Sequence, residues 1–200
     1  MNLNVSEIFY SLQGEGIRAG VPSIFIRLQG CKAKHACYAS GVRCDTEFES
    51  GKSYPLDEIM EWIDSNAVGC KDIVWTGGEP TDQLTSEILA AFNAQGFYQC
   101  IETSGLNPVP NGIDFITLSP KVAEHVLIKN FPDGVDEIKY IRHKGQSIPE
   151  PAIISKYKLL SPHSDGFTIN KENVNHCIKL CLQHPQWRLS IQQHKLWNIL

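Results

Sequence analysis

Residues 23–46 of the chain read SIFIRLQGCKAKHACYASGVRCDT, a run of β-forming residues that leads directly into a loop rich in cysteine. Period-2 alternation places Ile24, Ile26 and Leu28 on one face of an expected strand and leaves Arg27 on the opposite face. Cysteine thiolates bind soft metals and iron–sulfur clusters. The stretch therefore predicts a rigid strand that carries an arginine and ends beside a candidate metal centre.

Further segments of the chain have the composition of short strands, and helical patterns separate several of them. This alternation predicts a β/α series with a mostly parallel sheet. A closed eight-stranded barrel takes about 250 residues, whereas the chain has 200. We therefore expect an incomplete (β/α) barrel, formed by a single domain over residues 1–200. The expected strands cover residues 24–28, 73–76, 99–103, 115–118, 137–141, 156–160 and 187–192, and the expected helices cover 55–63, 85–95 and 171–183.

Polar or cysteine-bearing segments follow the ends of most of these expected strands. In parallel β/α folds the carboxyl ends of the strands form the functional face. Agreement among several strand ends is stronger than any one motif, so we expect the functional residues to share one edge of the sheet. The segments are Cys31, Thr76-Gly-Gly-Glu79, Glu102-Thr-Ser-Gly105, Ser119-Pro-Lys121, Ser161-Pro-His163 and Gln192-Gln-His-Lys195.

The overall composition excludes several classes of function. A formal net charge of −4 gives no general attraction to nucleic acid or to an anionic membrane. No apolar run approaches the roughly 20 residues that a membrane span needs, and the N-terminal residues lack the pattern of a signal peptide. We therefore expect a cytoplasmic protein with reduced thiols, whose seven cysteines are metal ligands or packing residues.

The cysteine loop has the spacing Cys31-x5-Cys37-x6-Cys44. A structural zinc site usually has four ligands, so zinc would need His35 or a distant residue as the fourth. A [4Fe–4S] cluster held by three thiolates would keep one iron open for a substrate or cofactor. The other four cysteines, which we interpret as packing residues, are Cys70, Cys100, Cys177 and Cys181.

Two groups of motifs resemble known families. The cysteine loop followed by Thr76-Gly-Gly-Glu-Pro80 resembles the radical S-adenosylmethionine enzymes. Within them, the chain looks like the 7-carboxy-7-deazaguanine synthase family from residue 6 to its last residue, least clearly over 122–135 and 141–160. The motifs that carry the narrower resemblance are Ser11-Leu-Gln-Gly-Glu-Gly16, Ile26-Arg-Leu-Gln-Gly-Cys31, Cys44-Asp-Thr46, Ile101-Glu-Thr-Ser-Gly105, Leu118-Ser-Pro-Lys121 and Arg188-Leu-Ser-Ile-Gln-Gln-His-Lys195.

This resemblance implies a lyase of queuosine and 7-deazapurine biosynthesis, a tRNA modification pathway. It would convert 6-carboxy-5,6,7,8-tetrahydropterin to 7-carboxy-7-deazaguanine with loss of ammonia. The implied cofactors are a [4Fe–4S] cluster, S-adenosylmethionine and Mg²⁺. Reduction of S-adenosylmethionine at the cluster generates the radical, so no side chain is implied to be catalytic in that step. The resemblance further implies a small-molecule substrate, an electron donor such as flavodoxin, and a homodimer.

The resemblance also assigns expected roles to individual residues. The expected cluster ligands are Cys31, Cys37 and Cys44, and the expected Mg²⁺ ligands are Thr46 and Asp45. The expected contacts to S-adenosylmethionine are Arg43, Cys44, Asp45, Gly78, Ser119, Pro120, Lys121, Ser161, Pro162, His163 and Ser164. The expected contacts to the substrate are Leu12, Gln13, Gly14, Arg27, Thr76 and Leu200, of which Arg27 would clamp the pterin carboxylate. Further candidates at the same site are Glu15, Glu102 and His194.

Some alternatives remain open in the sequence. The usual cysteine spacing of radical S-adenosylmethionine enzymes is C-x3-C-x2-C, and counted from Cys31 its second cysteine would fall at His35. Cys37 is therefore the expected second ligand and His35 the alternative, since imidazole can replace thiolate on iron. At the level of function, the alternatives are a glycyl-radical activating enzyme or another small radical enzyme, and a zinc-stabilised binding module.

Overall fold

In a computed structural model, residues 1–39, 46–164, 166 and 168–200 are described, and within them nine strands form a single sheet in the order β3-β1-β2-β4-β5-β6-β7-β8-β9. The strands are β1 (Asn2–Leu12), β2 (Pro22–Leu28), β3 (Lys52–Pro55), β4 (Asp72–Gly77), β5 (Tyr98–Thr103), β6 (Phe115–Leu118), β7 (Val135–Arg142), β8 (Ser155–Pro162) and β9 (Trp187–Leu189). The helices are α1 (Lys34–Ala39), α2 (Leu56–Asn66), α3 (Ser86–Asn93), α4 (Lys171–Gln183) and α5 (Gln193–Trp197), with short 3-10 turns at Pro80–Asp82, Glu124–Val126 and Ile128–Asn130.

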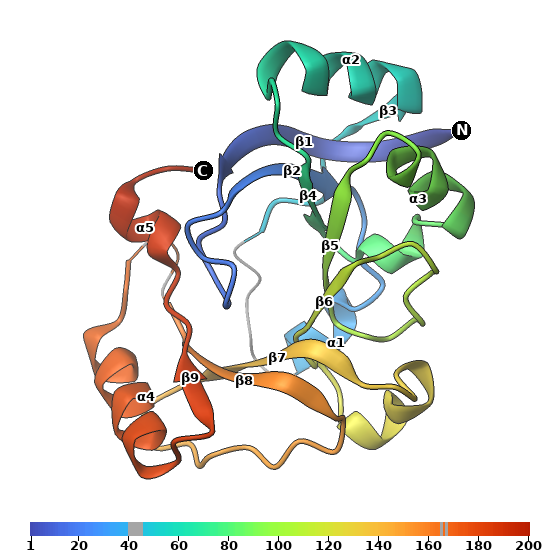
Figure 1. Cartoon of the computed structure of the whole chain (residues 1–200). Coiled ribbons are helices and arrows are strands. Elements are labelled where there is room, and N and C mark those ends of the chain that lie inside the picture. Colours follow the sequence, from blue (N-terminus) through green and yellow to red (C-terminus); the bar gives the residue numbers. More distant parts are fainter. Residues whose placement is uncertain (40–45, 165, 167) are drawn as a thin grey trace.

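The sheet curls into an incomplete ring, with α2, α3 and α4 on its outer side (Figure 1). From β2 to β9 all neighbouring strands are parallel, whereas β1 pairs with β2 and β3 pairs with β1 in the antiparallel sense. No pairing joins β1 or β3 to β9 among the described residues, so the barrel is open on that side. The expected incomplete barrel with a mostly parallel sheet is confirmed.

The outer face of the sheet is packed as the sequence periodicity predicts. Ile24, Ile26 and Leu28 of β2 are fully buried and belong to the core between the sheet and helices α2 and α3. From α2, Ile59 and Ile63 enter this core because a helix places residues four apart on one face. Burial of these aliphatic side chains is the main force that holds the helices against the sheet.

The inner face has two layers along the strands. The lower layer is a small apolar cluster of Phe9, Phe25, Val74, Cys100 and Phe115, which are neighbours in register across β1, β2, β4, β5 and β6. Phe9 and Phe25 stack with their ring centroids 4.8 Å apart. Along the parallel strands this layer precedes Arg27, Thr76 and Glu102, so a ligand at the carboxyl ends of the strands would lie above it.

The structure differs from the sequence-based expectations at three places. The expectation of about seven strands was wrong, because β1 and β3 add an antiparallel edge and the described residues form nine strands. The expected cysteine loop includes the short helix α1, Lys34–Ala39. The last expected strand, over 187–192, ends at Leu189, and Gln193–Trp197 forms the helix α5 where a tail was expected.

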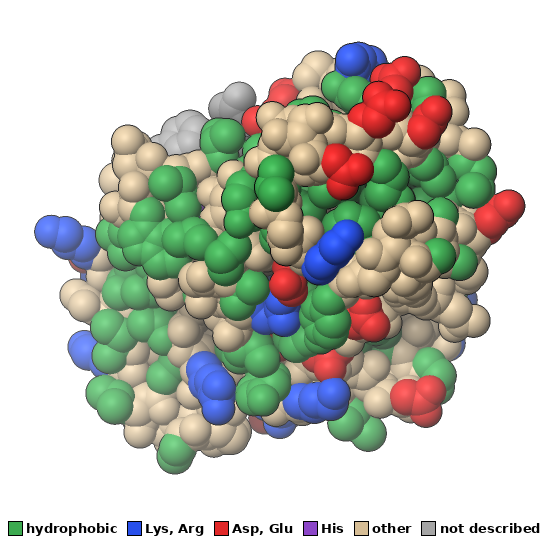
Figure 2. Space-filling model, turned by 45° about the horizontal axis from the view of Figure 1, so that its top comes forward, with side chains coloured by type: hydrophobic (Ala, Val, Ile, Leu, Met, Phe, Trp, Pro, Cys, Tyr) green, Lys and Arg blue, Asp and Glu red, His purple; other side chains and the backbone are tan. Residues whose placement is uncertain are grey.

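The surface in Figure 2 shows acidic side chains gathered at the upper right and hydrophobic side chains on the left. The exposed outer face of α2 carries the carboxylates Asp57, Glu58, Glu61 and Asp64. Around the C-terminus, the exposed large hydrophobic residues are Leu196, Trp197, Ile199 and Leu200. In the described part of the chain, no helix combines the length and apolar character needed to cross a membrane.

Candidate active site

Cys31 and Cys37 lie close together beyond the carboxyl end of β2. Burial raises the pKa of the Cys31 thiol to about 11, with the nearby charges of Glu79 and Cys37 adding to the increase, while backbone N–H groups of Ala33 and Lys34 oppose it. A bare thiolate is therefore unfavourable at Cys31, and a bound cation would stabilise it. A pair of cysteines, one of which is stabilised as thiolate by positive charge, fits an iron–sulfur cluster.

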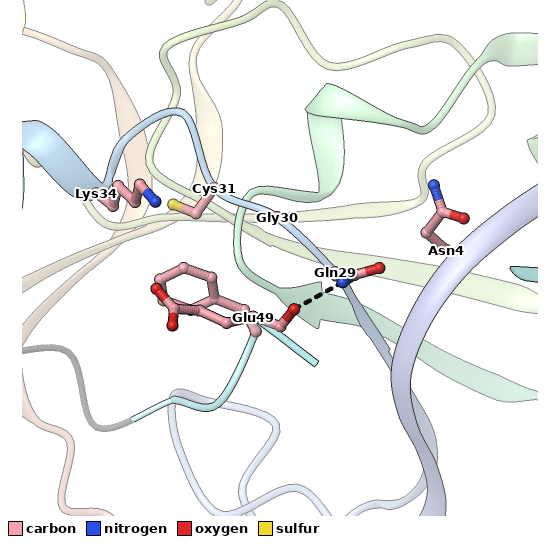
Figure 3. Close-up of a pocket in the computed structure, with 7 residues that line it drawn as sticks. Asn4, Gln29, Gly30, Cys31, Lys34 and Glu49 are labelled. Atoms are coloured by element: carbon pink, nitrogen blue, oxygen red, sulfur yellow. Dashed lines mark hydrogen bonds between the residues drawn. The ribbon is translucent and has the colours of Figure 1, made fainter. Parts of the chain in front are cut away.

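A pocket of about 430 Å³ opens beside the Cys31 side chain. Figure 3 shows Cys31 and Lys34 on one side of this pocket, Gln29 and Asn4 on the other, and Glu49 below them. The Gln29 amide donates to the Glu49 carbonyl oxygen at 2.7 Å, which ties the end of β2 to the segment after the cysteine loop. The first expected cluster ligand is thus accessible and lies beside a space that can hold a bound group.

The geometry of α1 distinguishes the two candidates for the second cluster ligand. Cys37 lies near enough to Cys31 to influence its pKa, and its side chain is partly buried. His35 is exposed and lies two positions earlier on the same helix, so its side chain leaves the helix in a different direction. The two candidates therefore differ in exposure and direction, and Cys37 as the second ligand stays a prediction.

Backbone hydrogen bonds join the turn after β4 to Leu28 and Gly30, the residues on either side of Gln29. The Gly78 N–H donates to the Leu28 carbonyl, and the Glu79 N–H donates to the Gly30 carbonyl, both at 3.0 Å. A Cβ atom at Gly78 would lie 1.8 Å from the Gly30 oxygen and 2.9 Å from the Cys31 Cβ. Packing against the Cys31 segment is thus one reason for glycine at position 78; its expected contact with S-adenosylmethionine stays a prediction.

Glu79 is a buried carboxylate that the sequence analysis did not single out. It is 1% exposed, and its two oxygens accept hydrogen bonds from both the turn and the end of β5. The Thr103 hydroxyl donates at 2.6 Å, the Ser104 N–H at 2.8 Å, and the Ser104 hydroxyl also contacts it. From the turn itself, the Thr81 hydroxyl donates at 2.7 Å. Glu79 therefore links β5 to the turn that abuts Cys31.

Above the apolar layer, polar side chains form a row across the inner face. Arg27 of β2 lies in register with Thr76 of β4, and Glu7 of β1 lies in register with Arg27. The Arg27 Nε is 3.3 Å from Glu7 Oε2. The carboxylate of Glu102 accepts from the Thr76 hydroxyl at 3.3 Å and from the Gln13 amide at 3.1 Å. The structure thus brings together four residues that the sequence analysis assigned to the site, and adds Glu7.

The row continues on β6 and β7, where charge is buried. Glu137 accepts from the Thr117 hydroxyl at 2.9 Å and from the Ile17 N–H at 3.0 Å, and burial raises the pKa of its carboxyl group. Two residues further along β7, the Lys139 Nζ is 2.6 Å from Glu15 Oε2. Glu15 was expected at the site, whereas Glu137 and Lys139 were not. Their signal in the sequence is the spacing of two, which places both charges on one face of a strand that also carries Asp136 and Arg142.

The segments expected to contact S-adenosylmethionine follow β6 and β8. The Ser119 N–H donates to the Thr103 carbonyl at 2.8 Å, and the Lys121 Nζ donates to the Ser119 hydroxyl at 3.1 Å. Ser161 and Pro162 are the last residues of β8 and are buried, whereas Ser164 is partly exposed. All of these residues lie at carboxyl ends of parallel strands, as does Gly78. Pro120 follows Ser119 and is partly exposed.

His163 stacks on His143, with 4.1 Å between the ring centroids. The backbone N–H of His163 donates to the Arg142 carbonyl at 2.9 Å. The backbone carbonyl of His163 accepts from the Asn173 side-chain amide at 2.8 Å. The backbone of His163 is therefore held between the end of β7 and helix α4. His163 was expected at the site, whereas no pattern in the sequence connects it with His143.

The C-terminal segment returns to the substrate-side loop after β1. The Gln193 N–H donates to the Gly14 carbonyl at 2.8 Å, and the Ser11 hydroxyl donates to the Leu200 carbonyl at 3.0 Å. A Cβ atom at Gly14 would lie 2.3 Å from His194 Nδ1, so glycine permits this approach. Leu12 precedes the loop and is exposed. The expected substrate residues at both ends of the chain are therefore neighbours.

Three expected site residues, Arg43, Cys44 and Asp45, lie outside the described residues. Thr46, the other expected Mg²⁺ ligand, is partly exposed and begins the next described segment. Among the residues that the structure describes, no group of three or more His, Cys, Asp or Glu side chains is arranged to hold a metal ion. The third cluster ligand and the Mg²⁺ site thus remain predictions.

Comparison with solved structures identifies the class of fold. The chain superimposes on a crystal structure of QueE from Escherichia coli with a TM-score of 0.69 and 24% identity, over 97% of this chain and 95% of the other. The shared fold is an open α/β barrel with a mostly parallel sheet. No family model matches the chain.

Curated sequences identify the family. The chain is 35% identical to the 7-carboxy-7-deazaguanine synthase of Bacteroides thetaiotaomicron over all of both chains. It is also 35% identical to the enzyme of the same name from Burkholderia multivorans, again over all of both chains. The Haemophilus influenzae enzyme is 35% identical over 99% of this chain and 94% of its own. The chain belongs to the 7-carboxy-7-deazaguanine synthase family, which decides against a glycyl-radical activating enzyme and a zinc-stabilised module.

Proposed function

We propose that the chain is a lyase that converts 6-carboxy-5,6,7,8-tetrahydropterin to 7-carboxy-7-deazaguanine and ammonia. The observation that carries this proposal is the polar row of Arg27, Thr76 and Glu102 on the inner face. Arg27 and Thr76 lie on β2 and β4, the two strands that lead to Cys31 and Gly78. A site for a polar ring is thus built on the strands that carry the expected cluster and cofactor residues.

The polar row matches the chemistry of the proposed substrate. Arg27 carries a fixed positive charge on a strand, and its guanidinium can bind the pterin carboxylate. Its Cζ lies 5.5 Å from the centre of the Phe9 ring, so the apolar layer supports it from below. Glu102 and Gln13 offer hydrogen-bond acceptors and donors for the edge of the pterin. The pterin would therefore lie flat above the apolar layer.

The proposed reaction has a simple balance, because the product differs from the substrate by one ammonia and no net oxidation is needed. When bound, S-adenosylmethionine and the [4Fe–4S] cluster would supply the radical that removes a hydrogen atom from the pterin. Cys31, Cys37 and Cys44 would hold the cluster, and Gly78 with the segments after β6 and β8 would hold S-adenosylmethionine. The protein's own role is to hold substrate and cofactor in contact and to exclude water.

The remaining parts of the proposal concern Mg²⁺ and partners. Thr46 and Asp45 would hold Mg²⁺, which prefers a few oxygen ligands and keeps several waters. An electron donor such as flavodoxin would reduce the cluster, and the exposed hydrophobic residues near the C-terminus support a homodimer. We also propose one radical S-adenosylmethionine domain over residues 1–200, in the cytoplasm, where thiols stay reduced.

An anaerobic assay tests the proposed function. The protein reconstituted with iron and sulfide is mixed with S-adenosylmethionine, dithionite and the carboxytetrahydropterin, and the products are separated by chromatography. We expect 7-carboxy-7-deazaguanine and ammonia in equal amounts. Cleavage of S-adenosylmethionine without a deazapurine product would contradict the proposed substrate.

Replacement of Arg27 by alanine is expected to weaken binding of the pterin. Loss of a charged hydrogen bond to the carboxylate costs about 1.5–3 kcal/mol, which corresponds to a rise in KM of roughly 10- to 100-fold. The content of iron and sulfide should not change, because Arg27 contacts Glu7 and Phe9 rather than the cysteines. Steady-state kinetics and metal analysis measure the two effects separately.

Arg188→Ala is the matched control for this prediction. Arg188 is also a strand arginine with its guanidinium over an aromatic ring, 4.8 Å from the centre of Tyr157, but it is exposed on β9. The control should keep the KM of the unmodified protein. If Arg27→Ala loses the cluster, Arg27 has a structural role and not the proposed one.

A further inference from the structure

The open side of the barrel is bridged by the loop that connects β1 to β2. In this loop, the Gly14 carbonyl accepts from the Gln193 N–H of α5, and the Gly16 N–H donates to the Ser190 hydroxyl at 2.9 Å. Figure 1 shows α5 and the C-terminus beside the end of β1, across from β9. Residues 13–17, which include two of the expected substrate contacts, are thus held by the far end of the sheet.

A largely buried ion pair also holds this loop. The Lys139 Nζ is 2.6 Å from Glu15 Oε2, with side chains that are 11% and 17% exposed. The other Glu15 oxygen accepts from the Gln192 amide at 3.0 Å. Such a pair has little water to replace a lost partner, so removal of one member is far more costly than at the surface.

Charged groups from several strands face this pair. Lys139 is surrounded by Glu15, Glu102 and Glu137, and although burial lowers its pKa, these carboxylates raise it above the usual value. Burial alone would raise the pKa of Glu15, but Lys139, Gln192 and His194 lower it to about 2. Both members of the pair are therefore charged at neutral pH.

Strand β7, which carries Lys139, contacts the loop a second time through Glu137. Glu137 accepts from the Ile17 N–H at 3.0 Å. A Cβ atom at Gly16 would lie 2.4 Å from Glu137 Oε1, so the loop backbone lies directly against this carboxylate. Lys139 and Glu137 are two residues apart and point to the same face of β7. Lys139 binds the side chain of Glu15, and Glu137 binds the backbone N–H of Ile17.

We infer that Lys139 is a positioning residue for the pterin, which acts by holding Glu15 and, with it, the Gln13–Ile17 loop across the open side of the barrel. This inference rests on the proposed function. Gln13 in the loop contacts Glu102, a member of the polar row, at 3.1 Å. Displacement of the loop would therefore remove Gln13 and Gly14 from the substrate while leaving Cys31 and Gly78 in place.

Replacement of Lys139 by methionine tests the inference in the reconstituted enzyme. At pH 7.5 or so we expect the KM for the pterin to rise about tenfold or more, with a smaller change in kcat, because the cost falls on substrate binding. The iron and sulfide content and the dissociation constant for S-adenosylmethionine, measured by equilibrium binding, should stay within about twofold. A merely structural defect would change all of these together.

Loss of Lys139 leaves the buried Glu15 carboxylate without its cation, and a second substitution can remove that charge. In Lys139→Met, Glu15 loses its cation, so burial raises the pKa of Glu15. Glu15 then stays in place when protonated and leaves the site when ionised, so the KM of this variant should increase as the pH rises. The double variant Glu15→Gln, Lys139→Met has no charge at position 15 to expel, although Glu102 and Glu137 also lose the lysine. Its KM should be lower than that of Lys139→Met and should depend less on pH.

The controls separate the possible failures. Lys156→Met breaks an ion pair of similar length, 2.7 Å to Asp136, but Lys156 is 72% exposed, and this variant should behave as the unmodified protein. If the unmodified protein makes no deazapurine, the proposed function fails. If it does, but Lys139→Met keeps its KM, or the double variant is no better than Lys139→Met, the positioning role is overturned.

Discussion

The Cys37→Ala variant is expected to lose the iron–sulfur cluster and with it all turnover of the pterin. Cys37 and Cys31 lie close enough for their charges to interact, and Cys31 has a pKa raised to about 11, so a stable cluster there depends on positive charge from bound iron. A [4Fe–4S] cluster with two protein thiolates in place of three has two open irons and is readily lost.

Iron and sulfide per chain, together with the visible absorbance after anaerobic reconstitution, measure this effect. Cys181→Ala is the matched control, because Cys181 is also a partly buried cysteine on a helix, but it belongs to the α4 packing cluster. The control should reconstitute fully. A cluster that survives in Cys37→Ala but is lost in His35→Ala would show that the imidazole, rather than this thiolate, is the second ligand.

The Gly78→Ala variant is expected to lose both cluster stability and binding of S-adenosylmethionine. The added methyl group would lie 1.8 Å from the Gly30 carbonyl oxygen, a distance that no rotamer change can relieve because both groups belong to the backbone. The turn must move away, which breaks the hydrogen bonds from Gly78 to Leu28 and from Glu79 to Gly30. We expect a loss of about 1–3 kcal/mol in the free energy of unfolding, typical of overpacking.

Chemical denaturation and binding of S-adenosylmethionine measure the two effects of this substitution. Gly69→Ala is a suitable control, because Gly69 has a φ of 80° but open space around its Cα. The control tests backbone strain without crowding and should lose about 1 kcal/mol of stability without a change in cofactor binding. Full binding of S-adenosylmethionine by Gly78→Ala would contradict the role we give to this turn.

These two expectations depend on one physical connection. The turn at Gly78 abuts Cys31, and Glu79 in the same turn is hydrogen-bonded to Thr103 and Ser104 of the neighbouring strand. The ends of β2, β4 and β5 therefore behave as one unit around the expected cluster. Lys139 belongs to a different unit, on β7, which is why its variant should change substrate binding and leave the cluster intact.

The sequence by itself determined the class of fold and the edge of the sheet where function resides. Ile24, Ile26 and Leu28 alternate with inward-facing residues, and this local period follows from the geometry of a strand alone. Most of the polar segments predicted to follow strands do lie at strand ends, because the residues that end a strand are its neighbours in the sequence. The motifs also identified the family, to which the curated relatives assign the chain.

Only the tertiary structure decided which residues meet across the barrel. Lys139 and Glu15 are 124 positions apart, and Gln192 is 177 positions from Glu15, so no local pattern could pair them. The antiparallel edge formed by β1 and β3 was equally hidden, since pairing between strands depends on long-range register rather than on composition. The stretch from Ser23 to Thr46 thus predicted where the metal chemistry lies, whereas the contacts of the loop after β1 with β7 and α5 exist only in the folded chain.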